Sequence, residues 1–126
     1  MNKVAVYGSL RQGLGNHRLL ASSKFLGEDI SQPEWKMYSL GGFPGIVKGN
    51  SEVTLEVYEV DKDTFESLDW LEGYPTFYNR RVINTTYGDA WVYYLNEPDN
   101  YENHGVVETG DWKDYLTNRY NYDNED

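Results

Sequence analysis

The chain of 126 residues contains no cysteine and only two histidines, His17 and His104. Without cysteine there can be no disulfide, no thiol nucleophile and no zinc site with cysteine ligands. The two histidines lie far apart in the sequence, which disfavours a histidine metal centre but leaves a carboxylate-bound magnesium ion open. We therefore expect an activity that uses neither a metal nor a cofactor.

Long apolar segments are also missing. No run approaches the roughly 20 apolar residues that a membrane-spanning helix needs, and the N-terminus has no apolar region followed by a cleavage site. We therefore expect a cytoplasmic protein with no membrane contact. Apolar residues make up 39% of the chain, and 12 Tyr and 4 Trp supply much of their bulk. This length and composition predict one globular domain with an aromatic-rich core.

Basic residues are scarce, with 11 Lys and Arg against 21 Asp and Glu. The imbalance is concentrated near the C-terminus: residues 1–96 carry 12 acids and 9 bases, whereas residues 97–126 carry 9 acids and 2 bases. This distribution disfavours nucleic-acid binding through a basic face, and leaves an acidic protein that mimics nucleic acid as a minority alternative. We divide the chain into a single domain, residues 1–120, and an acidic, frayed tail, residues 121–126.

The stretch 3–20, KVAVYGSLRQGLGNHRLL, joins a short β-forming run to a glycine-rich loop and a helical start. Gly8 ends the strand, and Asn16 is an N-cap candidate for the helical segment at 17–20. Backbone N–H groups in such a loop can bind a carboxylate or an oxyanion, although the same arrangement also serves as an ordinary connection. It is not a P-loop, because Leu14 and Gly15 stand where Lys and Ser or Thr are required.

A helix is predicted to begin near residue 62. Asp61 and Asp63 are both N-cap candidates, Glu66 could complete a capping box with Asp63, and Gly73 marks the end.

Glu72 falls on the apolar face of this helix, within the arc formed by Phe65, Leu68 and Leu71. Burial and the negative end of the helix dipole should both raise its pKa, which would suit a general base near neutral pH. The alternative is that the last turn frays and Glu72 turns into water. Asp69, near the edge of the stripe, is a weaker candidate.

Further strands are predicted at residues 25–30, 35–40, 52–60, 78–87 and 90–95. The last two should be joined by a hairpin turn at Gly88 and Asp89. Phe43, in a glycine-rich segment, could line a pocket or plug the core. Beyond Asn96 the sequence is polar, with residues 110–116 as a possible docked turn.

The order and spacing of several motifs resemble the γ-glutamylcyclotransferase family, including its γ-glutamylamine cyclotransferase and AIG2-like branch. These motifs are VYGSL at 6–10, Asn16-His17, Gly42-Phe43-Pro44, EVYEVD at 56–61, Leu68-Asp69, LEGY at 71–74, Tyr78-x-Arg80 and AWVY at 90–93. The resemblance implies an α+β fold, a small mixed β-barrel with flanking short helices. It also implies Glu72 as the catalytic carboxylate. The substrate-binding residues that it implies are Tyr7, Gly8, Ser9, Leu10, Tyr78 and Arg80.

The implied reaction converts a γ-glutamyl amide or peptide to 5-oxoproline and a free amine, with a small molecule as the partner and no nucleic acid. The resemblance leaves the attached amine and the oligomeric state open. Three other classes remain: a non-catalytic binding module with the same fold, the acidic DNA mimic, and a serine hydrolase built on Ser9 and His17. The last is disfavoured because no nucleophile elbow surrounds Ser9.

Overall fold

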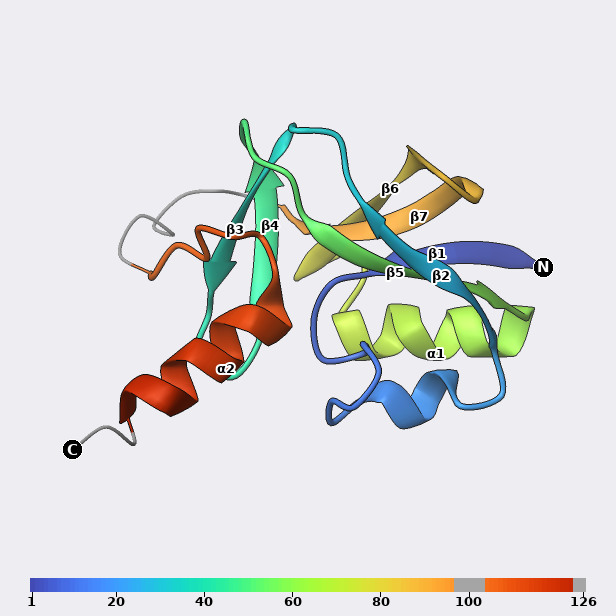
Figure 1. Cartoon of the computed structure of the whole chain (residues 1–126). Coiled ribbons are helices and arrows are strands. Elements are labelled where there is room, and N and C mark those ends of the chain that lie inside the picture. The colour runs from blue at the N-terminus through green and yellow to red at the C-terminus, as the bar shows by residue number, and fades with distance from the viewer. Residues whose placement is uncertain (97–103, 124–126) are drawn as a thin grey trace.

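The computed structural model describes residues 1–96 and 104–123, and its main element is a five-stranded mixed sheet (Figure 1). The strand order is β2–β5–β1–β7–β6. The central strand β1 runs antiparallel to β5 and parallel to β7. The bounds are β1 Asn2–Val6, β2 Lys24–Ile30, β5 Thr54–Val60, β6 Tyr78–Thr85 and β7 Gly88–Leu95.

A second sheet consists of the hairpin β3 (Trp35–Ser39) and β4 (Pro44–Lys48). Together with the helices, these two sheets confirm the predicted α+β class. The described strands pair into two separate sheets. Among these residues the pairings do not close into the barrel that the resemblance implies. None of the described helices is long and apolar enough to cross a membrane.

Helix α1 (Lys62–Glu72) has well-defined ends. Asp61, and not Asp63, is the N-cap, and its carboxylate accepts a hydrogen bond of 2.7 Å from the N–H of Thr64. Gly73 ends the helix in the left-handed conformation, with φ 65°, which a residue without a Cβ adopts at little cost. The helix lies against one side of the sheet next to the short 3₁₀ helix η1 (His17–Leu20) (Figure 1).

Asn16 is the N-cap residue of η1 by position, as predicted, but it does not cap with its side chain. Its side chain makes no capping hydrogen bond to η1 and instead donates to Ser9 Oγ at 2.8 Å. The hairpin turn also differs from the prediction by two residues. Thr85 pairs with Gly88, so Thr86 and Tyr87 form the turn, and Thr85 Oγ1 stabilises it by accepting a hydrogen bond from the N–H of Tyr87.

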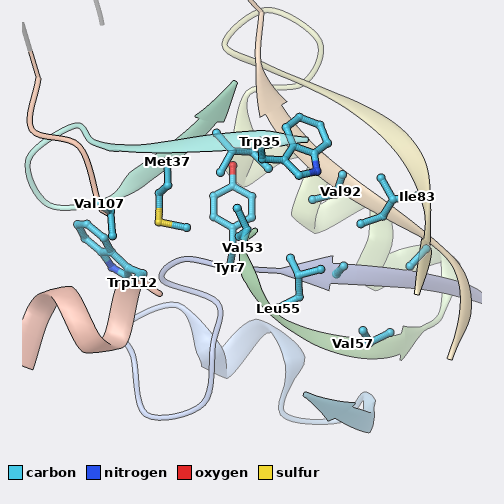
Figure 2. Close-up of a cluster of buried hydrophobic side chains, with 13 residues drawn as sticks. Tyr7, Trp35, Met37, Val53, Leu55, Val57, Ile83, Val92, Val107 and Trp112 are labelled. Atoms are coloured by element: carbon cyan, nitrogen blue, oxygen red, sulfur yellow. The ribbon is translucent and has the colours of Figure 1, made fainter. Parts of the chain in front are cut away.

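The C-terminal part forms helix α2 (Trp112–Asp123), where the sequence predicts only a docked turn. Trp112 is buried and packs in a core cluster near Met37 and Val107, and the N–H of Val107 donates to the Met37 carbonyl at 2.9 Å (Figure 2). The helix continues into the segment predicted to be a frayed tail, and residues 124–126 lie outside the described part. The division into a domain and a tail stays a prediction.

Candidate active site

A cavity of about 460 Å³ lies between the loop that follows β1 and the C-terminal end of α1. Five segments contribute to its wall: β1 with its loop, the β3–β4 connection, the end of α1, the start of β6, and β7. The lining residues are Ala5, Val6, Tyr7, Gly8, Ser9, Leu10, Asn16, Gly42, Phe43, Pro44, Leu71, Glu72, Phe77, Tyr78 and Tyr93. The fold therefore brings together six of the seven residues that the sequence proposes for the site.

Glu72 is the one charged residue among the described lining residues. It is the last residue of α1, and Gly73 fixes this turn by donating its N–H to the carbonyls of Asp69 and Trp70. The turn is thus ordered, and the alternative of a frayed end is wrong. Burial raises the pKa of Glu72 from 4.5 to about 7. Desolvation in the cavity wall is the cause.

Gly8, Ser9 and Leu10 of the loop after β1 line the same cavity. The carbonyl of Gly8 accepts from the N–H of Arg11 at 3.0 Å, and that of Ser9 accepts from the N–H of Asn16 at 3.0 Å. By contrast, the N–H groups of Gly8, Ser9 and Leu10 donate to no residue in the described parts of the chain. Three consecutive N–H groups without protein acceptors, in residues that line a cavity, can bind an anion.

Gly8 is required there because Pro44, the first residue of β4, approaches it closely. A Cβ at position 8 would lie 2.9 Å from the Pro44 ring. A side chain at this position would push the loop and the opposite wall of the cavity apart.

Arg11 anchors this loop through a buried ion-pair network that the sequence did not reveal. Its Nε lies 2.9 Å from Glu56 Oε2, and its Nη1 lies 2.8 Å from Asp111 Oδ1. Lys113 adds a contact of 3.1 Å to Glu56, and the N–H of Gln12 donates to Glu56 Oε1 at 2.8 Å. Burial alone would raise the pKa of Glu56, but the hydrogen bonds from Gln12, Arg11 and Lys113 outweigh it, and the net shift is downward.

Three tyrosine hydroxyls in the wall are already engaged as donors. Tyr7 donates to the carbonyl of Tyr93 at 2.8 Å, Tyr78 donates to that of Pro44 at 2.6 Å, and Tyr93 donates to Asp69 Oδ1 at 2.7 Å. Figure 2 shows the ring of Tyr7 within the core cluster, in line with its exposure of 6%. Burial raises the pKa of Tyr7 and Tyr93, so both stay protonated. The three rings therefore form part of the cavity wall, and the hydrogen bonds that their hydroxyls donate stabilise it.

Arg80 is not among the described residues that line the cavity, and its predicted contact with substrate stays a prediction. Its Nε and Nη2 bind the two carboxylate oxygens of Asp69 at 2.9 and 3.2 Å. Its guanidinium also lies 4.7, 4.2 and 4.5 Å from the ring centroids of Phe65, Tyr74 and Trp91. The reason is that β6 places Arg80 beside Asp69 and Phe65 of α1, Tyr74 after its end and Trp91 of β7, and this carboxylate and these three rings surround the cation. Arg80 holds α1 one turn before Glu72.

The arrangement needed for a serine hydrolase is not formed. Ser9 Oγ is bound by Asn16, and His17 Nδ1 lies 3.0 Å from the carbonyl of Leu10. In the described parts of the chain, no group of three or more His, Cys, Asp or Glu could hold a metal ion. Phe43, for which the sequence left two alternatives, lines the cavity.

Residues 4–114 match the family described as "Gamma-glutamyl cyclotransferase, AIG2-like". The chain belongs to this family. A relative from Vibrio cholerae is 43% identical over 109 residues, which cover 86% of this chain and 93% of that protein. The γ-glutamylcyclotransferase family protein YtfP of Escherichia coli K12 is 40% identical over 112 residues, covering 89% and 96%.

Solved structures agree. An uncharacterised protein of Pyrococcus horikoshii superposes with a TM-score of 0.84 at 31% identity, covering 96% of this chain and 98% of that one. An AIG2-like protein of mouse, with a TM-score of 0.75 at 22% identity over 86% of each chain, shares the fold. The resemblance inferred from the sequence motifs is thus confirmed.

Proposed function

We propose that this protein is a γ-glutamylcyclotransferase that converts a γ-glutamyl amide or peptide to 5-oxoproline and a free amine. The observation that carries the proposal is Glu72: a carboxylate with a pKa of about 7 that faces the same cavity as three free backbone donors. A group that titrates near neutral pH can both accept and return a proton during one turnover. The volume of about 460 Å³ also suits a small-molecule substrate.

The reaction needs little from the protein besides proton transfer and positioning. The α-amine of the γ-glutamyl group attacks its own γ-carbonyl carbon and closes a five-membered ring, so the nucleophile is already tethered. Glu72 first takes the proton that this nitrogen loses. The C–N bond of the tetrahedral intermediate then breaks, and Glu72 returns the proton to the leaving amine. Every atom of the substrate is found in the two products, and no water is consumed.

The free N–H groups of Gly8, Ser9 and Leu10 would stabilise negative charge in this sequence of steps. They can hold the oxyanion of the tetrahedral intermediate or the substrate's α-carboxylate. Tyr78 would contribute its ring to the wall of the site and would not transfer a proton, because its hydroxyl already donates to the Pro44 carbonyl. Arg80 would act on the reaction only through the position of α1.

The test is turnover of a γ-glutamyl amide in ¹⁸O-labelled water, followed by mass analysis. We expect unlabelled 5-oxoproline, since the γ-carbonyl oxygen stays in the product. Hydrolysis of the same bond would give glutamate with one solvent oxygen. An N-acetylated substrate serves as the control, because its nitrogen is no longer nucleophilic and it should not react. Labelled glutamate, or cleavage of the acetylated compound, would show that Glu72 activates water and would refute the proposal. Ligand binding without turnover would favour a non-catalytic module.

A further inference from the structure

The opening of the cavity is apolar. Phe43, Leu71 and Phe77 line the cavity, yet 40%, 42% and 46% of their surfaces remain exposed. Residues that both line a cavity and reach solvent lie at its rim. They come from three different segments: the β3–β4 connection, the end of α1 and the residue before β6. The rings of Phe43 and Phe77 meet edge to face, with 6.1 Å between their centroids.

The rim lies beyond the parts of the cavity already assigned. The γ-glutamyl group would lie beside Glu72 and the loop after β1, whose lining residues are less exposed than the rim. Whatever is attached to the γ-carbonyl must then extend toward the opening. The three rim side chains are therefore placed to contact the leaving amine, which the proposed function leaves unspecified.

The charge of the wall restricts that amine. The described lining contains no Lys, Arg or His, and its one charge is the Glu72 carboxylate. A leaving group with its own carboxylate, as in a γ-glutamyl amino acid or glutathione, would find no cation among these residues and would be repelled by Glu72. A phenyl or branched alkyl group would instead bury apolar surface against the rim, and an aromatic one could also pack edge to face on the two phenylalanines.

We propose, on the basis of the cyclotransferase function, that the preferred substrates are γ-glutamyl amides of neutral, apolar amines, aromatic above all, and that Phe43, Leu71 and Phe77 determine this preference. Apolar contact between a leaving group and such side chains typically changes kcat/KM by about 10- to 100-fold.

Four substrates separate the effect of an aromatic ring in the leaving group from the effect of a carboxylate. γ-Glutamyl-phenethylamide and γ-glutamylphenylalanine carry the same ring and differ in the carboxylate; γ-glutamyl-ethylamide and γ-glutamylalanine form the matching pair without the ring. We expect the ring to raise kcat/KM for 5-oxoproline formation by about 10- to 100-fold, and the carboxylate to lower it by about tenfold.

A substitution at the rim tests whether its residues cause the preference for an aromatic leaving group. In Phe77→Ala, the ratio of kcat/KM for the phenethylamide to that for the ethylamide should fall at least fivefold toward one. The matched control is Phe25→Ala on β2, which removes a ring of similar exposure, 42%, outside the described lining and should leave the ratio unchanged. Thermal unfolding of both variants checks that they fold.

The outcomes distinguish this inference from the function on which it rests. Equal kcat/KM for all four substrates, or a preference for the two that carry a carboxylate, would overturn the rim assignment and leave the cyclotransferase standing. An unchanged ratio in Phe77→Ala would do the same. Absence of 5-oxoproline from every substrate would instead refute the function and this inference with it.

Discussion

Replacing Glu72 with glutamine should abolish turnover and, above neutral pH, make the fold more stable. Glutamine keeps the size of the side chain and much of its hydrogen bonding, but it cannot accept the proton of the α-amine. The loss of a general base typically lowers kcat by about 10²- to 10⁴-fold. In the native protein, kcat/KM should fall about tenfold per pH unit below the pKa of about 7, because only ionised Glu72 can act as the base.

The stability effect follows from the same pKa. The folded protein holds the pKa of Glu72 at about 7, against an ordinary value of 4.5. Since one pKa unit corresponds to about 1.4 kcal/mol, ionising Glu72 in the folded state costs about 3 kcal/mol. Below pH 4.5 both states keep the proton and there is no cost. Between the two pKa values the unfolded chain loses the proton while the folded one keeps it, so the stability falls as pH rises.

The assay is urea unfolding, followed by fluorescence, of the native protein and of Glu72→Gln at pH 4.5 and pH 8. The free energy of unfolding of the variant relative to the native protein should increase by about 3 kcal/mol between these two pH values. Glu66→Gln, which removes an exposed carboxylate from the same helix, should show no such increase. Full activity of a correctly folded Glu72→Gln protein would refute the assignment of Glu72 as the base. The same pH dependence in variant and native protein would show that Glu72 is not desolvated.

Other substitutions test the supporting structure. Arg11→Met should lower the free energy of unfolding by about 3–5 kcal/mol in urea titrations, because Glu56 would stay buried without its main cation; a loss below about 1 kcal/mol would contradict the anchoring role. Arg80→Met should lower stability by about 1–3 kcal/mol and leave KM nearly unchanged, whereas a large rise in KM at native stability would restore Arg80 as a substrate-binding residue. Gly8→Ala should raise KM, measured with a γ-glutamyl amide, because its Cβ would push against Pro44.

The features that could be predicted from the sequence are those with local physical causes. Helix α1 carries its own start and stop signals at Asp61 and Gly73, and both form as expected. The position of Glu72 on the apolar face follows from the helical repeat alone. The strand and glycine loop at residues 3–20 are also local, so the loop and Glu72 could be named as candidate site components before any tertiary structure was known.

The features that could not be predicted depend on contacts between distant segments. Glu56 alternates with apolar residues in β5, and this pattern places it on the polar face, yet it is 1% exposed. Its partner Arg11 lies 45 residues away, and the second acid bound by Arg11, Asp111, lies 100 residues away. The contacts of Arg80 were missed for the same reason, because its partners Asp69 and Trp91 come beside it only when β6 packs next to α1 and β7.

Two glutamates of this chain show how environment decides the role of a carboxylate. Glu56 is buried with four donors around it, so it stays ionised and holds the first loop, β5 and the start of α2 together. Glu72 is half-buried, and no group in the described parts of the chain donates to it, so the folded state favours its protonated form until pH 7 is approached. Giving Glu72 a cation would stabilise its charge and lower its basicity. The proposed base must lose its proton near neutral pH and yet hold one during turnover. A Glu72 without a cation beside it meets both requirements, although its ionisation destabilises the fold.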